Sequence, residues 1–233
     1  MDQKIINIRQ DIDTIDKKII SLLEERIVLV NKIGKLKSAN QDVSYIKADR
    51  EYSMVRNLIR LSSSIPSEVI LQIWRNIISY SLYSEKKYEI FLLGNKQTFD
   101  KVYYLIRIYF SSLPEIAHCD PSDVNWSNAV INNPSNIIVA DINDDQFIKF
   151  LKDNLQFKIF AKLDARIGEE YYAAAKIPLS CLATTTKLFL IKEVSRNKND
   201  KILRRITIGD EKYLVVNGES HNVGALLGAY ATL

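Results

Sequence analysis

Residues 5–36 read IINIRQDIDTIDKKIISLLEERIVLVNKIGKL, and this stretch decides the first part of the fold. An apolar residue recurs every three or four positions from Ile5 to Leu36, with no Gly or Pro before Gly34. This spacing predicts one amphipathic helix that ends near Ser38 and is about 50 Å long at 1.5 Å per residue. The rest of the N-terminal region is too short to cover such a stripe. We therefore expect a second copy of the chain to bury it.

Two shorter helices are predicted after a polar break at residues 38–42. One covers residues 48–61, and the turn Ser62-Ser63-Ser64-Ile65-Pro66 ends it. The next begins at Pro66, Ser67 and Glu68, which suit the first turn of a helix, and runs to about Glu85. Residues 1–87 are thus expected to form an all-α domain of one long and two shorter helices, as an intertwined dimer.

The pattern changes after Lys87, where short apolar runs alternate with amphipathic ones. We predict helices at 98–110 and 146–155, strands at 88–94, 137–140, 157–163 and 186–194, and a hairpin at 202–216 that turns at Gly209-Asp210. Strands that alternate with helices are typical of an α/β domain. We therefore expect a second, α/β domain over residues 88–233.

Composition indicates an ordinary globular chain with 47% hydrophobic and 26% charged residues. Its net charge of +4 arises within residues 1–87, which hold 15 Lys and Arg against 11 Asp and Glu. No apolar signal segment follows the start, and no run reaches the roughly 18 apolar residues that cross a membrane. We expect a cytoplasmic chain in which Cys119 and Cys181 are reduced thiols, although a disulfide between them stays open. No basic recognition helix is evident, so a nucleic-acid partner is not expected.

Charged residues interrupt the apolar stripe of the long helix. Arg26 follows Leu22 on the seam, and Lys37 lies eleven positions further on, about 20° away at 100° per residue. Arg9 lies 17 positions before Arg26 and about 100° around the helix, so it cannot reach the same pocket in the same chain. In an antiparallel dimer, however, it can reach the pocket of the other chain.

The two shorter helices carry similar interruptions. Arg50 and Glu51 lie one turn before apolar residues of the second helix, and the third continues its stripe through Ser81 to Glu85. Each residue alone has an ordinary interpretation, such as a register-setting arginine, a surface ion pair or a solvated last turn. Together they point cations, carboxyls and a hydroxyl into one interior, which is costly unless these groups find partners. The combination predicts a pocket for a small polyanion.

The order and spacing of these residues resemble the all-helical class of chorismate mutases over about residues 5–86. The resemblance rests on the series Arg9, Asp16, Leu22-Leu23-x-x-Arg26, Gly34-x-x-Lys37, Asp49-Arg50-Glu51 and Trp74-Arg75-x-Ile77-Ile78-x-x-Ser81-x-x-x-Glu85. It implies an isomerase that converts chorismate to prephenate in a homodimer with shared sites. The reaction is a unimolecular pericyclic shift, so the resemblance implies no nucleophile, metal or cofactor.

The resemblance also implies roles for the residues that bind the substrate carboxylates. Arg26 and the Arg9 of the other chain would clamp the two carboxylates of chorismate, for which the planar guanidinium is well suited. Arg50 and Ser81 would line the same side of the pocket.

The remaining implied roles concern the bond that breaks and the ring hydroxyl. Lys37 and Glu85 would donate hydrogen bonds to the ether oxygen, and Glu51 would hold the hydroxyl. A charged Glu85 would repel the developing negative charge, so we expect it to act when protonated. Some family members have an acid just before the Asp-Arg-Glu motif, where this chain has Lys47, so recognition of the hydroxyl is expected to depend on Glu51 alone.

The second domain faintly resembles a prephenate dehydratase domain. Phe91-Leu92-Leu93-Gly94 is similar to its opening, and residues 186–190 are similar to the strand with its Thr-Arg-Phe motif, but here the Arg is absent. We expect a dehydratase-like domain without dehydratase activity, and residues 1–87 to suffice for mutase activity. His118 and His221 lack metal-ligand spacing and are expected on the surface or in loops. Two alternatives stay open: a bifunctional mutase–dehydratase, and a non-catalytic helical dimerisation module with an α/β sensor domain.

Overall fold

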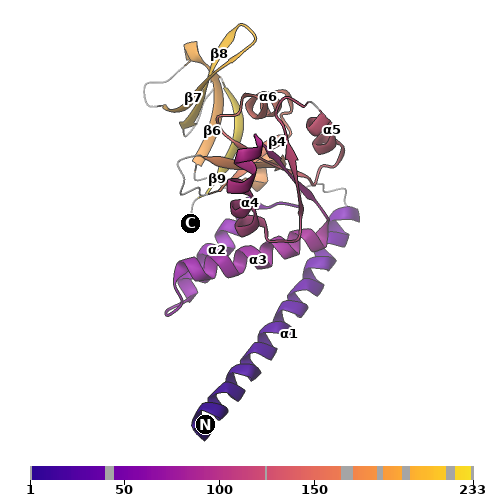
Figure 1. Cartoon of the computed structure of the whole chain (residues 1–233), viewed down its shortest axis with the longest axis vertical. Coiled ribbons are helices and arrows are strands. Elements are labelled where there is room, and N and C mark those ends of the chain that lie inside the picture. Colours follow the sequence, from indigo (N-terminus) through magenta and orange to yellow (C-terminus); the bar gives the residue numbers. More distant parts are fainter. Residues whose placement is uncertain are drawn as a thin grey trace.

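The structure is a computed structural model that describes residues 2–39, 45–123, 125–163, 170–182, 186–195, 200–218 and 224–231. Three helices come first, and a mixed sheet with three further α-helices follows (Figure 1). The predicted fold class, an all-α region followed by an α/β region, is confirmed. His221 lies outside the described residues. Within the described part of the chain, no helix is both long and apolar enough to cross a membrane.

The helical region consists of α1 (Gln3–Ala39), α2 (Ala48–Leu61) and α3 (Ser67–Glu85), close to the predicted bounds. α3 packs against both α1 and α2. Only Val30 and Gly34 of α1 are buried, and the N-terminal half of this helix extends away from the rest of the chain (Figure 1). The apolar stripe of that half is therefore exposed in the single chain.

The α/β region is built on one nine-stranded sheet in the order β2-β1-β3-β5-β4-β9-β6-β8-β7. Its elements are β1 (Glu89–Leu93), α4 (Lys96–Phe110), β2 (Glu115–Cys119), α5 (Asn125–Asn132), β3 (Ile137–Asp141), α6 (Asp145–Asp153), β4 (Phe157–Leu163), β5 (Tyr171–Lys176), η1 (Leu179–Cys181), β6 (Thr186–Lys192), η2 (Glu193–Ser195), β7 (Lys201–Ile208), β8 (Glu211–Gly218) and β9 (Gly224–Tyr230). β1 pairs in parallel with β2 and β3, and β4 with β9, while the other neighbours are antiparallel. The predicted strands and the hairpin at Gly209-Asp210 are present, whereas β2, α5, β5 and β9 were not predicted.

Two apolar cores lie on opposite faces of the sheet. One combines α5 and α6 with the sheet, and its helical members include Trp126, Phe147 and Phe150. The other combines α4 with the opposite face and also takes in Ile46 and Ala48 from the start of α2. The helical region therefore shares a core with the α/β region, and α3 packs directly on α4.

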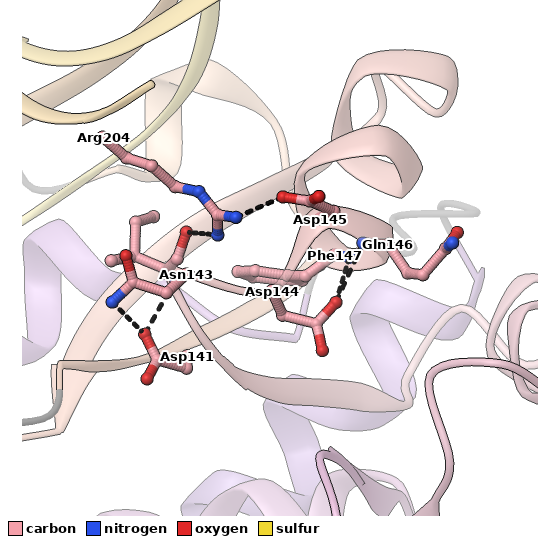
Figure 2. Close-up of polar contacts among 8 residues, drawn as sticks. Asp141, Asn143, Asp144, Asp145, Gln146, Phe147 and Arg204 are labelled. Atoms are coloured by element: carbon pink, nitrogen blue, oxygen red, sulfur yellow. Dashed lines mark hydrogen bonds and ion pairs between the residues drawn. The ribbon is translucent and has the colours of Figure 1, made fainter. Parts of the chain in front are cut away.

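The turn between β3 and α6 is fixed by polar contacts (Figure 2). The Asp144 carboxylate caps α6 by accepting hydrogen bonds from the backbone N–H groups of Gln146 (2.9 Å) and Phe147 (3.0 Å). Arg204 of β7 donates to the carbonyl of Ile142 (3.0 Å) and forms an ion pair with Asp145. Asp144 thus begins α6, and the contacts of Arg204 tie the β7–β8 hairpin to this turn.

Candidate functional site

α1 and α3 cross most closely where Gly34 meets Glu85. A Cβ atom at Gly34 would lie 3.4 Å from both Cα and Cγ of Glu85, at the limit of ordinary van der Waals contact. The hydroxyl of Ser84 also donates to Asn31 Oδ1 at 2.8 Å. A glycine at this point therefore lets the end of α3 lie directly against α1, where the polar residues of both helices meet.

Arg26 of α1 reaches across the crossing to Ser81 of α3. Its Nη1 atom donates to Ser81 Oγ, and Ser81 in turn donates to the carbonyl of Ile77 at 2.6 Å. Burial lowers the pKa of Arg26, the positive charge of Arg50 lowers it further, and Glu85 opposes both effects. Because the guanidinium stays protonated, Arg26 and Arg50 repel each other, and a bound anion would reduce this repulsion.

Lys37 of α1 and Glu85, one turn after Ser81 on α3, form an ion pair. Nζ of Lys37 lies 2.7 Å from Oε2 of Glu85, with the two side chains 14% and 9% exposed. The same ammonium donates to the carbonyl of Tyr45 at 3.4 Å and lies 5.5 Å from the centre of its ring. Both members of the pair are thus held in fixed positions and largely out of solvent.

Glu51 of α2 lies beside Arg75 of α3. Its Oε2 is 3.4 Å from Nη1 of Arg75, and the side chains are 14% and 15% exposed. Burial raises the pKa of Glu51, and the charges of Arg75 and Lys37 oppose this increase. The interaction with Lys37 links Glu51 electrostatically to the Lys37–Glu85 pair.

The remaining residues of the predicted site lie apart from this cluster. Arg50 is exposed at the start of α2, although it is near enough to Arg26 to lower its pKa. Arg9 is exposed on the extended half of α1, about 25 Å along the helix axis from Arg26. Lys47 points toward the α/β region, where its ammonium donates to Sγ of Cys181 at 3.3 Å. Within one chain, Arg26, Lys37, Glu51, Ser81 and Glu85 are therefore assembled, with Arg50 at the rim and Arg9 distant.

Two polar neighbours of the cluster were not singled out from the sequence. Arg75 was noted in the motif without a role, and Tyr109 of α4 was not expected near the site. Arg75 precedes the buried Ser79 by one turn, so these two polar residues lie on the same face of α3. This second polar pair on α3 was a signal in the sequence that the helix has two buried faces. Nothing in the sequence indicates that Tyr109 lies against Arg75, because that contact depends on how α4 packs on α3.

The arrangement suits a small anion with several polar groups better than chemistry by a nucleophile. Guanidinium, ammonium, carboxyl and hydroxyl groups converge on one crossing, where they are held by partners and shielded from water. Among the described residues, no group of three or more His, Cys, Asp or Glu side chains is placed to hold a metal ion. His118 lies on the exposed side of β2, where its Nε2 is 2.8 Å from the carbonyl oxygen of Gly94.

Comparisons with known proteins agree with this geometry. The chain is 36% identical over 103 residues to the bifunctional chorismate mutase/prephenate dehydratase of Aquifex aeolicus, with 42% of this chain and 28% of that protein covered. It is 32% identical over 100 residues to the protein of that name from Neisseria gonorrhoeae (42% and 27% covered), and 32% over 148 residues to that of Buchnera aphidicola (59% and 36% covered). The chain thus spans between 27% and 36% of the length of these relatives.

No solved structure matches the chain significantly. The Buchnera match covers 59% of the chain, more than residues 1–87 can supply, so it continues into the α/β region. The family model for chorismate mutase type II matches residues 8–86, which include Arg9, Arg26, Lys37, Glu51 and Glu85. Residues 8–86 of this chain are therefore similar to chorismate mutase type II domains.

Proposed function

We propose that this chain isomerises chorismate to prephenate at the crossing of α1 and α3. The observation that carries the proposal is the juxtaposition of the Arg26–Ser81 contact and the Lys37–Glu85 pair, which are one turn of α3 apart and largely buried. Chorismate has two carboxylates, an ether oxygen and a ring hydroxyl, and the cluster offers a partner for each. The family match over residues 8–86 supports the same assignment.

Arg26 would bind one carboxylate of chorismate. Its guanidinium is already oriented by Ser81, so little side-chain freedom is lost when the substrate binds. The repulsion between Arg26 and Arg50 favours an anion at this position. We propose that the second carboxylate binds the partner subunit's Arg9, with Arg50 at the rim. Clamping both carboxylates would hold the substrate in its compact, reactive conformation.

Lys37 and Glu85 would act on the ether oxygen, where negative charge develops as the carbon–oxygen bond breaks. The two groups are 2.7 Å apart in the structure, close enough for both to contact one oxygen atom of a bound substrate. The ammonium of Lys37 would donate directly, and Glu85 would donate when protonated. Donors fixed in advance stabilise the transition state more than flexible ones, because they need no reorganisation during the reaction. Glu51 would accept a hydrogen bond from the ring hydroxyl in its carboxylate form.

The working form is proposed to be a homodimer with two shared sites. The support is the exposed apolar stripe on the extended half of α1. Its members are between 46% and 63% exposed in the single chain: Ile5, Ile8, Ile12, Ile15, Ile19 and Leu22. An exposed patch of this size is unfavourable for a monomer and suits a self-complementary interface. The same interface would bring the partner subunit's Arg9 to the site.

The α/β region, residues 88–233, is proposed to be a dehydratase-like domain that follows the mutase unit of residues 1–87. The Buchnera match supports the likeness, and the printed names of all three relatives favour a bifunctional enzyme as the second candidate. We favour a domain without dehydratase activity because Lys187 of β6 stands where the Thr-Arg-Phe motif has its Arg. Formation of phenylpyruvate from prephenate at neutral pH would establish the bifunctional alternative.

We propose that the chain works in the cytoplasm without a nucleic-acid partner. Both cysteines are free thiols, and Cys181 is buried, which suits a reducing compartment. The basic residues that define the site lie at a helix crossing, whereas nucleic-acid binding requires them on an open face.

The test is Arg26→Ala in the full chain, with prephenate formation from chorismate as the assay. Loss of one charge-assisted contact to a carboxylate is expected to lower kcat/KM by at least about 100-fold. Arg60→Ala is the matched control, because Arg60 is an exposed arginine in the last turn of α2. If wild-type chain dimerises but forms no prephenate, the chain is a dimerisation module and the proposal is wrong. If Arg26→Ala is as active as Arg60→Ala, the site has been misplaced.

A further inference from the structure

A continuous stack of side chains joins the α/β region to Glu51. Arg75 contacts the Glu51 carboxylate at 3.4 Å, and its guanidinium carbon lies 4.3 Å from the centre of the Tyr109 ring. Tyr109 belongs to α4, so the stack runs from α2 through α3 into the α/β region. A guanidinium over an aromatic face is attracted by the electrons of the ring, and more strongly where water is excluded. Arg75 is therefore held between a carboxylate on one side and a ring on the other.

The backbone around Tyr109 is held in place as well. The hydroxyl of Ser79, one turn after Arg75 on α3, donates to the carbonyl of Tyr109 at 3.4 Å. Ser79 is buried, and α3 and α4 are packed together along this face. The position of the Tyr109 ring relative to Arg75 is thus determined by the packing of two helices rather than by a flexible loop.

A second contact secures the start of α2, which carries Arg50 and Glu51. Ile46 and Ala48 are buried in the same apolar core as Cys181 and Leu182 of the α/β region. Lys47 lies between Ile46 and Ala48 in the sequence, and its ammonium donates to Sγ of Cys181 at 3.3 Å. The carbonyl of Lys47 also accepts the first helical hydrogen bond of Glu51, at 2.9 Å. The backbone from which Glu51 projects is therefore anchored on η1.

We propose that the α/β region is a structural part of the mutase site, in which Tyr109 and Arg75 are positioning residues for Glu51. The inference rests on the proposed function, in which Glu51 accepts the ring hydroxyl of chorismate. Tyr109 does not touch the substrate in this proposal, because it acts through Arg75. The proposal departs from the expectation that residues 1–87 suffice for activity, since those residues lack both Tyr109 and Cys181.

The charges around Glu51 give the proposal a measurable consequence. Burial favours the protonated form and raises the pKa of Glu51, whereas Arg75 of α3, a hydrogen bond from the backbone of Lys47 and the charge of Lys37 of α1 lower it. The hydroxyls of Tyr88 and Tyr109 also face this carboxyl, and burial raises the pKa of Tyr109, so it stays neutral. If the Tyr109 ring is removed, Arg75 is positioned less firmly beside Glu51. Its electrostatic interaction with the carboxylate then weakens, and the pKa of Glu51 rises further.

The sign of the activity change follows from the form of Glu51 that binds substrate. The carboxylate accepts a stronger, charge-assisted hydrogen bond from the hydroxyl than the protonated acid does, so activity falls as pH drops through the pKa of Glu51. A higher pKa moves this acid limb of the kcat/KM profile to higher pH. A residue that merely stabilised the fold would lower the amount of active protein equally at every pH at which the chain stays folded.

The experiment compares Tyr109→Leu with Tyr109→Phe and Tyr104→Leu in the full chain, following kcat/KM for chorismate across pH. Tyr109→Leu removes the ring and is expected to move the acid limb up by about one pH unit, which is a tenfold loss on that limb. Tyr109→Phe keeps the ring and is expected to restore the wild-type profile. Tyr104 is a 69% exposed tyrosine of α4, so its change to Leu is the matched control and should leave the profile unmoved.

Arg75→Gln provides a second route if Tyr109→Leu does not fold, because it leaves the packing of α4 intact. It removes the charge next to Glu51 and is expected to move the acid limb in the same direction. If the full chain is active but Tyr109→Leu and Arg75→Gln both keep the wild-type pH profile, the inference is wrong and the proposed function is unaffected. An inactive wild-type chain would instead refute the proposed function, and the inference with it.

Discussion

Glu85 gives the sharpest test of how the site would act on the ether oxygen. Its carboxyl lies 2.7 Å from the ammonium of Lys37 and is 9% exposed, at the point where Gly34 lets α1 approach α3. We predict opposite outcomes for two substitutions at this position. Glu85→Gln supplies a permanent neutral donor of nearly the same shape, whereas Glu85→Ala removes the donor and leaves Lys37 without its carboxyl partner.

The expected magnitudes follow from what a fixed donor contributes to a developing oxyanion. Loss of one such donor costs about 3 kcal/mol, which is about 100-fold in kcat, so Glu85→Ala should lose at least this factor at every pH. Glu85→Gln should keep substantial activity. Its amide donates to the ether oxygen without carrying the negative charge that would repel it.

The assay is the steady-state rate of chorismate consumption across pH, with the thermal midpoint of each variant as the folding control. Glu68→Ala is the matched control, since Glu68 is an exposed acid in the first turn of the same helix. A Glu85→Ala enzyme within a factor of about two of wild type, as exposed substitutions normally are, would remove Glu85 from the site. A folded Gln variant as inactive as the Ala variant would show that a neutral donor at this position does not serve the ether oxygen.

Further predictions concern the dimer. Mixing inactive Arg9→Ala and Arg26→Ala chains should restore roughly one good site per heterodimer, since each site would take Arg9 from one chain and Arg26 from the other. Refolded mixtures that are no more active than the two parent variants would contradict shared sites. Ile12→Asp should shift the dimer toward monomer in sedimentation experiments, because Ile12 is 50% exposed on the stripe of α1 in the single chain. A dimer would lose two such buried side chains, one from each chain, at a cost of about 3 to 6 kcal/mol, or more than 100-fold in Kd. An unchanged sedimentation coefficient at low concentration would rule out the stripe as the interface.

The helical region was predictable because local signals agree there. The apolar spacing of α1 and the Pro66-Ser67-Glu68 start of α3 lie within the elements they define, and the structure has these helices within a few residues of the predicted bounds. The candidate site followed from the same periodicity, since a polar residue on an apolar stripe marks an interior position. Arg26, Lys37, Ser81 and Glu85 could therefore be expected to meet before their contacts were known.

The unpredicted elements are those whose local sequence is weak or misleading. β5 contains Ala173, Ala174 and Ala175, and alanine has little preference for strands, so only its place between β3 and β4 makes it one. β9 contains Gly228, whose missing Cβ is required because it would lie 2.1 Å from the carbonyl oxygen of Ile159. β2 is a short strand at the edge of the sheet, and its apolar side chains are only partly buried. Such strands depend on neighbours that are distant in the sequence.

The same limitation explains what the sequence could not indicate about the site. The contact between Arg75 and Tyr109 joins the helical region to the α/β region, and so does the hydrogen bond from Lys47 to Cys181. Neither leaves a periodic signal, because each depends on how α3 and α2 pack against the α/β region. The contacts on which the proposed role of the α/β region rests could therefore be seen only in the structure.

The most direct test of the central claim is to incubate the purified full chain with chorismate and follow the products by NMR. The account predicts that chorismate is converted to prephenate much faster than in buffer alone, that Arg26→Ala abolishes the acceleration while the chain stays dimeric, and that no phenylpyruvate accumulates at neutral pH. A folded, dimeric wild-type chain that leaves chorismate at the buffer rate would contradict the account.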